Sequence, residues 1–163
     1  MWLRGDHFEG ARLPYAGGTL AMTVVLPDEG HESDALTDVL SRLTQHGDPG
    51  GLELSMPRWT FRTPSDLKVP LMRLGMVDAF TARADFGPMS PSDPLYVSDV
   101  LHDAFIAVDE NGTEAAAATA VVVGEASAQV PRHALVLDRP FVFVIHDTAH
   151  GAPLFVGRVA DPS

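Results

Sequence analysis

Cysteine is absent from this sequence of 163 residues, which excludes a disulfide framework and any thiolate chemistry. Basic residues are scarce, since 11 lysines and arginines stand against 22 aspartates and glutamates and the formal net charge is −11. An acidic surface repels phosphate backbones and anionic lipids. We therefore expect no nucleic-acid partner and no association with a membrane surface.

Long hydrophobic runs are missing too. The longest apolar run, residues 115–123, is much shorter than the roughly 20 residues of a membrane-spanning helix, and it contains Thr119. The first residues, MWLRGDHFEG, lack the apolar stretch of a secretory signal peptide. A packed core is nevertheless expected, because apolar residues make up 45% of the chain and charged residues only 20%.

Signatures of an enzyme or a metal site are equally lacking. No Gly-x-Ser-x-Gly nucleophile elbow occurs, and Ser127 stands in a loop-like stretch without a base indicated nearby. His146 and His150 have the i, i+4 spacing with which a helix binds a metal. They fall between two predicted strands and no third ligand is evident, so we interpret them as residues of a solvated loop. We expect no enzymatic activity, no metal and no cofactor.

Apolar segments separated by glycine and proline are what the sequence does contain. Residues 12–15 and 20–26 predict two strands around a turn at 16–18. Further strands are predicted for residues 52–56, 95–108, 141–145 and 154–159. In the segment 95–108, the alternation of a strand places four side chains on one face: His102, Ala104, Ile106 and Val108.

Two helices are predicted between these strands. The first has an apolar stripe at i, i+3, i+4 and i+7, made of Leu36, Val39, Leu40 and Leu43. Ser33 is expected to be its N-cap, Asp34 suits its positive N-terminal end, and Gly47 is expected to stop it. The second is a short helix at 71–74 that ends at Gly75, and an ordered loop is expected at 85–94.

These elements indicate an α+β fold with largely antiparallel pairing, because strands outnumber helices and their spacing fits no βαβ series. Several long apolar strands have no obvious helices to cover them. We therefore expect that the chain forms only an incomplete domain.

The segment that begins at Gly112 is unusual on physical grounds alone. Four consecutive alanines, 115–118, favour a helix, whereas the valines at 121–123 favour a strand. Small side chains let a segment enter a crowded sheet without overpacking it. The following residues, 124–129, look like an exposed loop. Composition therefore leaves a loop and a buried strand both open for this segment.

Three stretches of the sequence resemble the serpin family, over essentially the whole chain and in the family's order. VSDVLHDAFIAVDENGTEAAAATAVVV resembles the fifth strand of the family's sheet A followed by its hinge. The stretch RPFVFVIHDTAHGAPLFVGRVADP resembles the last strand pair of the family. The stretch LPYAGG…LAMTVVLPDEG resembles a strand pair that comes well before the reactive loop of the family. The resemblance implies that residues 1–163 form the C-terminal part of a serpin domain, an α+β fold of mostly antiparallel sheets with a few helices that lacks the N-terminal part.

The resemblance implies that residues 112–130 are the hinge and reactive-centre loop. In this family a target serine protease attacks a loop carbonyl, and the freed loop then inserts into sheet A with the protease attached. Family spacing, counted from Gly112 and from Arg139, implies cleavage between Ala126 and Ser127, with Glu125–Ala126 as the neighbouring alternative. A small alanine at this place suggests an elastase-like or subtilisin-like target.

The resemblance also assigns structural roles. His102 corresponds to the family's shutter histidine, which acts as a structural switch. The sequon that begins at Asn111 is interpreted as accidental, since a glycan there would obstruct the hinge. The hinge comprises Gly112, Thr113, Glu114, Ala115, Ala116, Ala117 and Ala118.

Two functions stay open at this point. The first is suicide-substrate inhibition of a serine-type endopeptidase, with the missing N-terminal half of the domain as a further partner. The second is a truncated, non-inhibitory remnant whose loop is only a protease substrate or a partner-binding surface. The resemblance implies an extracellular location, and a cytoplasmic location stays open as well.

Overall fold

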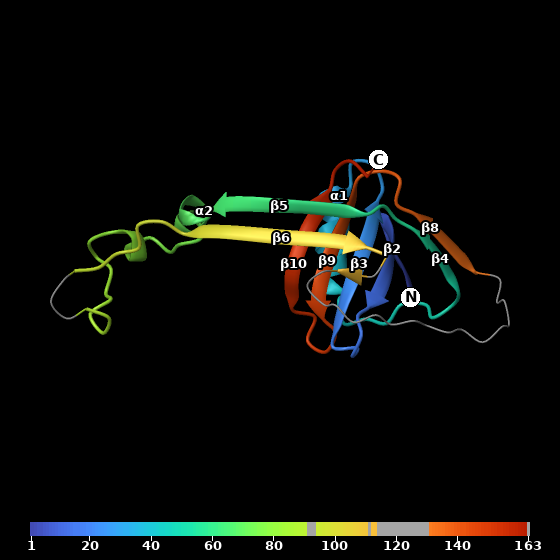
Figure 1. Ribbon diagram of the computed structural model, residues 1–163, viewed down its shortest axis with the longest axis horizontal. Helices are drawn as coiled ribbons and strands as arrows, with labels where there is room; N and C mark the ends of the chain where they lie inside the picture. Colours follow the sequence, from blue (N-terminus) through green and yellow to red (C-terminus); the bar gives the residue numbers. More distant parts are fainter. Residues whose placement is uncertain (91–93, 111, 114–130, 163) are drawn as a thin grey trace. The chain divides into compact units, whose positions relative to one another are not determined.

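The computed structural model describes residues 1–90, 94–110, 112–113 and 131–162. Figure 1 shows the course of the chain through these residues. The chain divides into two compact units, of which the first comprises residues 1–59 and 107–163 and the second comprises 60–106.

The first unit is built on a five-stranded antiparallel sheet with the order β1-β2-β3-β9-β10. Its central pair joins β3, from the early part of the chain, to β9, from the late part, with Val24 opposite Phe143. The strands are β1 (Trp2–Gly5), β2 (Phe8–Pro14), β3 (Leu20–Pro27), β9 (Phe141–Asp147) and β10 (Pro153–Val159).

Most of this sheet agrees with the sequence-based expectation. The hairpin of β2 and β3 forms around a turn in which Gly17 and Gly18 have positive φ angles of 88° and 71°. The last two strands form as predicted, although β9 extends through His146 to Asp147. Strand β1 was not predicted, because WLRG has neither a clear alternation nor an apolar run.

The two faces of the sheet are covered by different side chains. On one face, side chains of the strands pack with side chains of residues 35–43 in a buried cluster. The cluster comprises Phe8, Val25, Val142, Val144, Ala35, Val39 and Leu43. On the other face Trp59 packs against Phe141 and Phe143, with ring centroids 5.3 and 5.6 Å apart. A Cβ on Gly157 would lie 2.4 Å from the Phe143 ring, so this ring requires a glycine opposite it.

Helix α1 (Glu32–Ser41) differs from its prediction at both ends. Its N-cap is His31 and makes no side-chain capping bond, so the expectation that Ser33 caps the helix is wrong. The helix ends at Ser41, and Gly47 instead lies where a Cβ would meet the Trp2 carbonyl oxygen at 2.5 Å. Thus a close approach of two backbones, rather than a helix stop, requires the glycine.

The apolar stripe of α1 is also shifted. Val39 and Leu43 are buried as predicted, but Leu40 is 37% exposed and Ala35 is buried in its place. Spacing of four residues, from Ala35 to Val39 to Leu43, points these side chains at the sheet. The prediction that Leu40 faces the core is therefore wrong.

A two-stranded parallel sheet, an exception to the antiparallel pairing, joins β4 (Leu52–Ser55) to β8 (His133–Val136). The strand predicted at 52–56 is confirmed, with alternating half-buried and exposed residues. Strand β8 was not predicted, since it is short and is separated from β9 only by 137–140.

The third sheet has the order β5-β6-β7 and comprises β5 (Trp59–Asp66), β6 (Leu101–Asp109) and β7 (Gly112–Thr113). The long strand predicted at 95–108 begins only at Leu101. Ile106 and Val108 are buried, as expected for residues on one face. Strand β5 was not predicted, because Pro64 and its polar neighbours do not resemble a strand.

The second unit contains two short helices, α2 (Lys68–Arg73) and the 3₁₀ helix η1 (Asp78–Phe80). The short helix predicted at 71–74 is confirmed, but it begins at Lys68. Gly75 follows it with a φ of 101°, a conformation that favours glycine. In the part of the chain that the structure describes, we find no helix long and apolar enough to cross a membrane.

The core of the five-stranded sheet can be tested with a matched pair of valines. Val144 is completely buried, whereas its register partner Val156 is 50% exposed. We expect Val144→Ala to lower the free energy of unfolding by about 2–3 kcal/mol, because it removes buried methyl groups and leaves a cavity. Val156→Ala should cost less than about 1 kcal/mol in the same urea titration. Equal losses would contradict the described burial.

Candidate functional site

The candidate loop is visible in the structure through its two flanks. On the N-terminal side, Gly112 and the backbone of Thr113 are described as strand β7. The other predicted hinge residues and the predicted cleavage site lie outside the described residues: Glu114, Ala115, Ala116, Ala117, Ala118, Ala126 and Ser127.

The N-terminal flank leaves the end of β6 in a tight hairpin. Thr113 pairs with Val108 and Gly112 with Asp109, in antiparallel register. Gly112 has a φ of 121°, a conformation that L side chains rarely adopt. A glycine is therefore required at the residue where the chain turns away from β6.

Strand β6 has little pairing on the side of β7. β7 covers only Val108 and Asp109, so among the described strands residues 101–107 have a neighbour on the β5 side alone. Unpaired N–H and C=O groups along such an edge are a template for a further strand. His102 lies on this part of β6 and is exposed.

The C-terminal flank of the candidate loop runs into β8. The backbone N–H groups of Arg132 and His133 both donate to the Gly51 carbonyl, at 2.8 and 3.2 Å. Farther on, the Leu137 N–H donates to the Ser55 carbonyl at 2.8 Å. The two flanks of the candidate loop are thus held by two different sheets.

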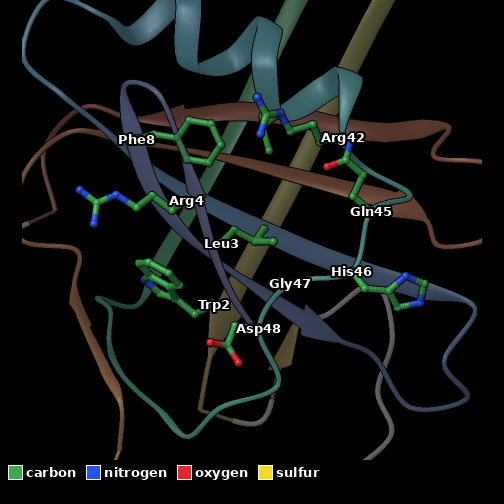
Figure 2. A pocket seen from close by; sticks show the side chains of 10 residues that line it. Trp2, Leu3, Arg4, Phe8, Arg42, Gln45, His46, Gly47 and Asp48 are labelled. Atoms are coloured by element: carbon green, nitrogen blue, oxygen red, sulfur yellow. The ribbon is translucent and has the colours of Figure 1, made fainter.

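A cavity of about 230 Å³ lies beside this C-terminal flank, between the β1–β2 pair, the end of α1 and the turn that follows it. Figure 2 shows Trp2 and Asp48 at one end of the cavity and Phe8 and Arg42 at the other. The lining residues are Trp2, Leu3, Arg4, Phe8, Val39, Arg42, Gln45, His46, Gly47 and Asp48.

His146 is the clearest disagreement with the sequence interpretation. It is a fully buried residue of β9 and not part of a solvated loop. Its Nδ1 lies 3.2 Å from the Asp147 carbonyl, and its Nε2 lies 3.0 Å from the Thr23 hydroxyl. The Nδ1 atom therefore carries a proton, because a carbonyl oxygen only accepts. His150 is exposed, as expected, and contacts the Asp147 carboxylate at 2.6 Å.

A buried arginine completes the polar contacts on this face of the sheet. Arg12 pairs with Thr23 in the β2–β3 register and is only 5% exposed. Its guanidinium donates to the carbonyls of Gln45 and Arg42, at 2.5 and 3.3 Å, and so satisfies acceptors beyond the end of α1. Burial lowers the pKa of His146, and the nearby charge of Arg12 lowers it further. Within the described ranges, no group of three or more acidic or histidine side chains could hold a metal.

The chain belongs to the serpin family. Residues 2–162 match the family model described as "Serpin (serine protease inhibitor)". The chain is 38% identical over 156 residues to a serpin-like protein of Methanosarcina acetivorans, with 92% of this chain and 36% of that protein covered. It is 39% identical over 161 residues to the leukocyte elastase inhibitor of Sus scrofa, with 92% of this chain and 42% of that protein covered.

A solved structure supports the same assignment. The native state of a thermophilic serpin, tengpin, superposes with a TM-score of 0.78 at 31% identity, covering 98% of this chain and 43% of that chain. The predicted family and the predicted α+β fold are thereby confirmed. The chain spans about two-fifths of the length of these relatives.

Sequence reasoning missed the contacts of Arg12, Thr23 and His146, and those of Trp2, Asp48 and His133. Each set joins residues that are far apart along the chain, so no local spacing could indicate it. The one available signal was the apolar surroundings of His146, since FVFVIH continues a buried strand.

The buried imidazole of His146 predicts a dependence of stability on pH. Its folded-state pKa lies below the ordinary value of 6.5. At pH values near and below 6.5 the unfolded chain therefore binds more protons than the folded chain does. We expect the free energy of unfolding to decrease as the pH is lowered from 7.5 to about 5, measured by urea titration. His146→Gln should flatten this slope, whatever its effect on stability at neutral pH.

The exposed His150 provides the control for this experiment. His150→Gln should keep the parent slope, because the side chain of His150 is 83% exposed in the folded chain. If His146→Gln and the parent had the same slope, His146 would not be the buried group responsible.

Proposed function

We propose that this chain carries the reactive-centre part of a serpin-type inhibitor of serine endopeptidases, with 112–130 as hinge and bait loop and Ala126–Ser127 as the cleaved bond. The observation that carries this proposal is the position of Gly112, where the chain leaves β6 beside a strand edge that β7 hardly covers. A segment starting there can fold back and pair along β6. The small residues of the hinge suit such an insertion.

The proposed mechanism uses the protease's own chemistry. The serine of the protease attacks the carbonyl of Ala126, and the amine of Ser127 leaves as the acyl-enzyme forms. Cleavage frees the N-terminal flank to insert beside β6. Roughly a dozen new backbone hydrogen bonds at about 1 kcal/mol each would supply a driving force on the order of 10 kcal/mol.

Insertion needs a second strand on the other side of the inserted loop. The described sheet provides β6 as one neighbouring strand for the inserted loop, and no other described strand provides the second neighbour. We therefore propose that the N-terminal part of the domain, supplied by the same protein or by another chain, is a required partner. Without it, the loop acts only as a substrate, which is the function of the non-inhibitory alternative.

The target is proposed to be an elastase-like or subtilisin-like protease, because Ala126 fits a shallow specificity pocket. One relative is named for inhibition of leukocyte elastase, which agrees with this class. His102 is proposed to act as the shutter residue, on the strand beside which the loop inserts.

The cleavage site can be tested by a switch of specificity. We expect an elastase-like protease to cut the chain after Ala126, seen as two fragments by mass analysis. Ala126→Arg should transfer this cleavage to a trypsin-like protease, since its specificity pocket carries an aspartate. Glu125→Arg is the matched control and should keep the elastase-like cleavage after Ala126. If Glu125→Arg instead lost that cleavage and gained a trypsin-like cut, the cleaved bond would lie one residue earlier. Cutting outside 112–130 would contradict the bait-loop assignment.

The hinge can be tested in the protein completed by its N-terminal part. Thr113→Arg should replace the detergent-stable covalent complex by cleaved protein, because an inserted charge would have to be buried unpaired at a cost of several kcal/mol. Glu114→Arg is the control, since neighbouring residues of a strand point to opposite faces. The readout is the ratio of complex to cleaved protein on a denaturing gel. If the completed parent yields only cleaved fragments, the chain is the non-inhibitory remnant.

A further inference from the structure

Three side chains from separate parts of the chain meet where the C-terminal flank packs beside β1 and the turn that follows α1. The rings of Trp2 and His133 stack with their centroids 3.9 Å apart and their planes 2° apart. The Nε2 atom of His133 also lies 3.2 Å from a carboxylate oxygen of Asp48. His133 is the first residue of β8, so this contact comes soon after the candidate loop ends at 130.

Trp2 and Asp48 are held to each other independently of His133. Their backbones exchange two hydrogen bonds, of 3.0 and 2.9 Å, as an isolated antiparallel bridge. The second carboxylate oxygen of Asp48 accepts the Gly50 N–H at 2.8 Å. The stacking surface and the acceptor are therefore already in place for His133, which reduces the entropic cost of holding it.

Strand β8 depends on such side-chain contacts. It pairs with β4 over only four residue pairs, and a two-stranded sheet of this size is marginal by itself. Along β8, Leu135 is buried but Val136 is 51% exposed. The side chain of His133 is 23% exposed, so most of it is covered in the folded chain.

We propose that Trp2, His133 and Asp48 form a clamp that fixes the C-terminal flank of the loop, and that His133 is thereby a positioning residue for recognition by the protease. The positioning role rests on the proposed function, whereas the clamp is built from described residues alone. A loop fixed at this end offers one bond to the protease. Release of His133 would free the start of β8 from β4 and expose further bonds to cleavage.

The clamp is tested by hydrogen exchange in the full chain. His133→Ala loses both the stack and the hydrogen bond, so the amides of 132–136 should exchange about tenfold faster. His133→Phe keeps the stack alone and should give an intermediate acceleration. Val144→Ala destabilises the sheet away from the clamp and corrects for any general loss of stability.

A second readout follows the carboxylate directly. The Gly50 N–H, and after it the His133 side chain, lower the pKa of Asp48. In His133→Phe the pKa of Asp48, followed by NMR of its side-chain carbon, should move up toward the ordinary value. His150→Phe, which removes the similar partner of Asp147, should leave Asp48 unchanged.

Proteolysis connects the clamp to recognition. The parent should be cut by an elastase-like protease at Ala126–Ser127 alone, and His133→Ala should add cuts within 128–136. If exchange, the pKa of Asp48 and the cut pattern all stay at the parent values, the clamp is overturned while the bait loop stands. If the parent is not cut at Ala126–Ser127, the proposed function fails, and the positioning role of His133 fails with it.

Discussion

The pairing of β3 with β9 is the interaction on which the first unit depends. It joins an early and a late segment of the chain over six residue pairs, from Leu20 opposite Asp147 to Val25 opposite Val142. Val24 and Val144 are completely buried, so both strands lie in the interior of the unit. Helix α1 covers one face of this pair and Trp59 packs on the other. Strand β8, which follows the candidate loop, is joined to β9 by residues 137–140.

Two sheets with different properties hold the flanks of the candidate loop. The N-terminal flank leaves β6, whose edge is largely unpaired among the described strands, and the C-terminal flank enters the small β4–β8 sheet beside Trp2 and Asp48. An unpaired edge is a liability for a protein that stays monomeric, yet insertion of a loop requires one. The chain spans about two-fifths of the length of its relatives.

Polar groups inside the first unit show how the packing is completed. Backbone carbonyls just beyond α1 need donors, and Arg12 reaches them from the sheet. The same face holds the Thr23–His146 hydrogen bond, and burial lowers the pKa of this imidazole. We therefore expect this end of the helix–sheet interface to depend on pH, in contrast to the purely apolar cluster around Val39 and Val142.

Sequence by itself determined the elements whose signal is local. Turn residues and apolar runs predicted β2, β3, β9 and β10, the short helix before Gly75, and, through the resemblance, the family. Only the tertiary structure decided that Leu40 faces solvent, that His146 is buried, and that Trp2, Asp48 and His133 meet. The physical reason is that periodicity reports which side chains share a face of one element, whereas burial and pairing depend on which distant element covers that face.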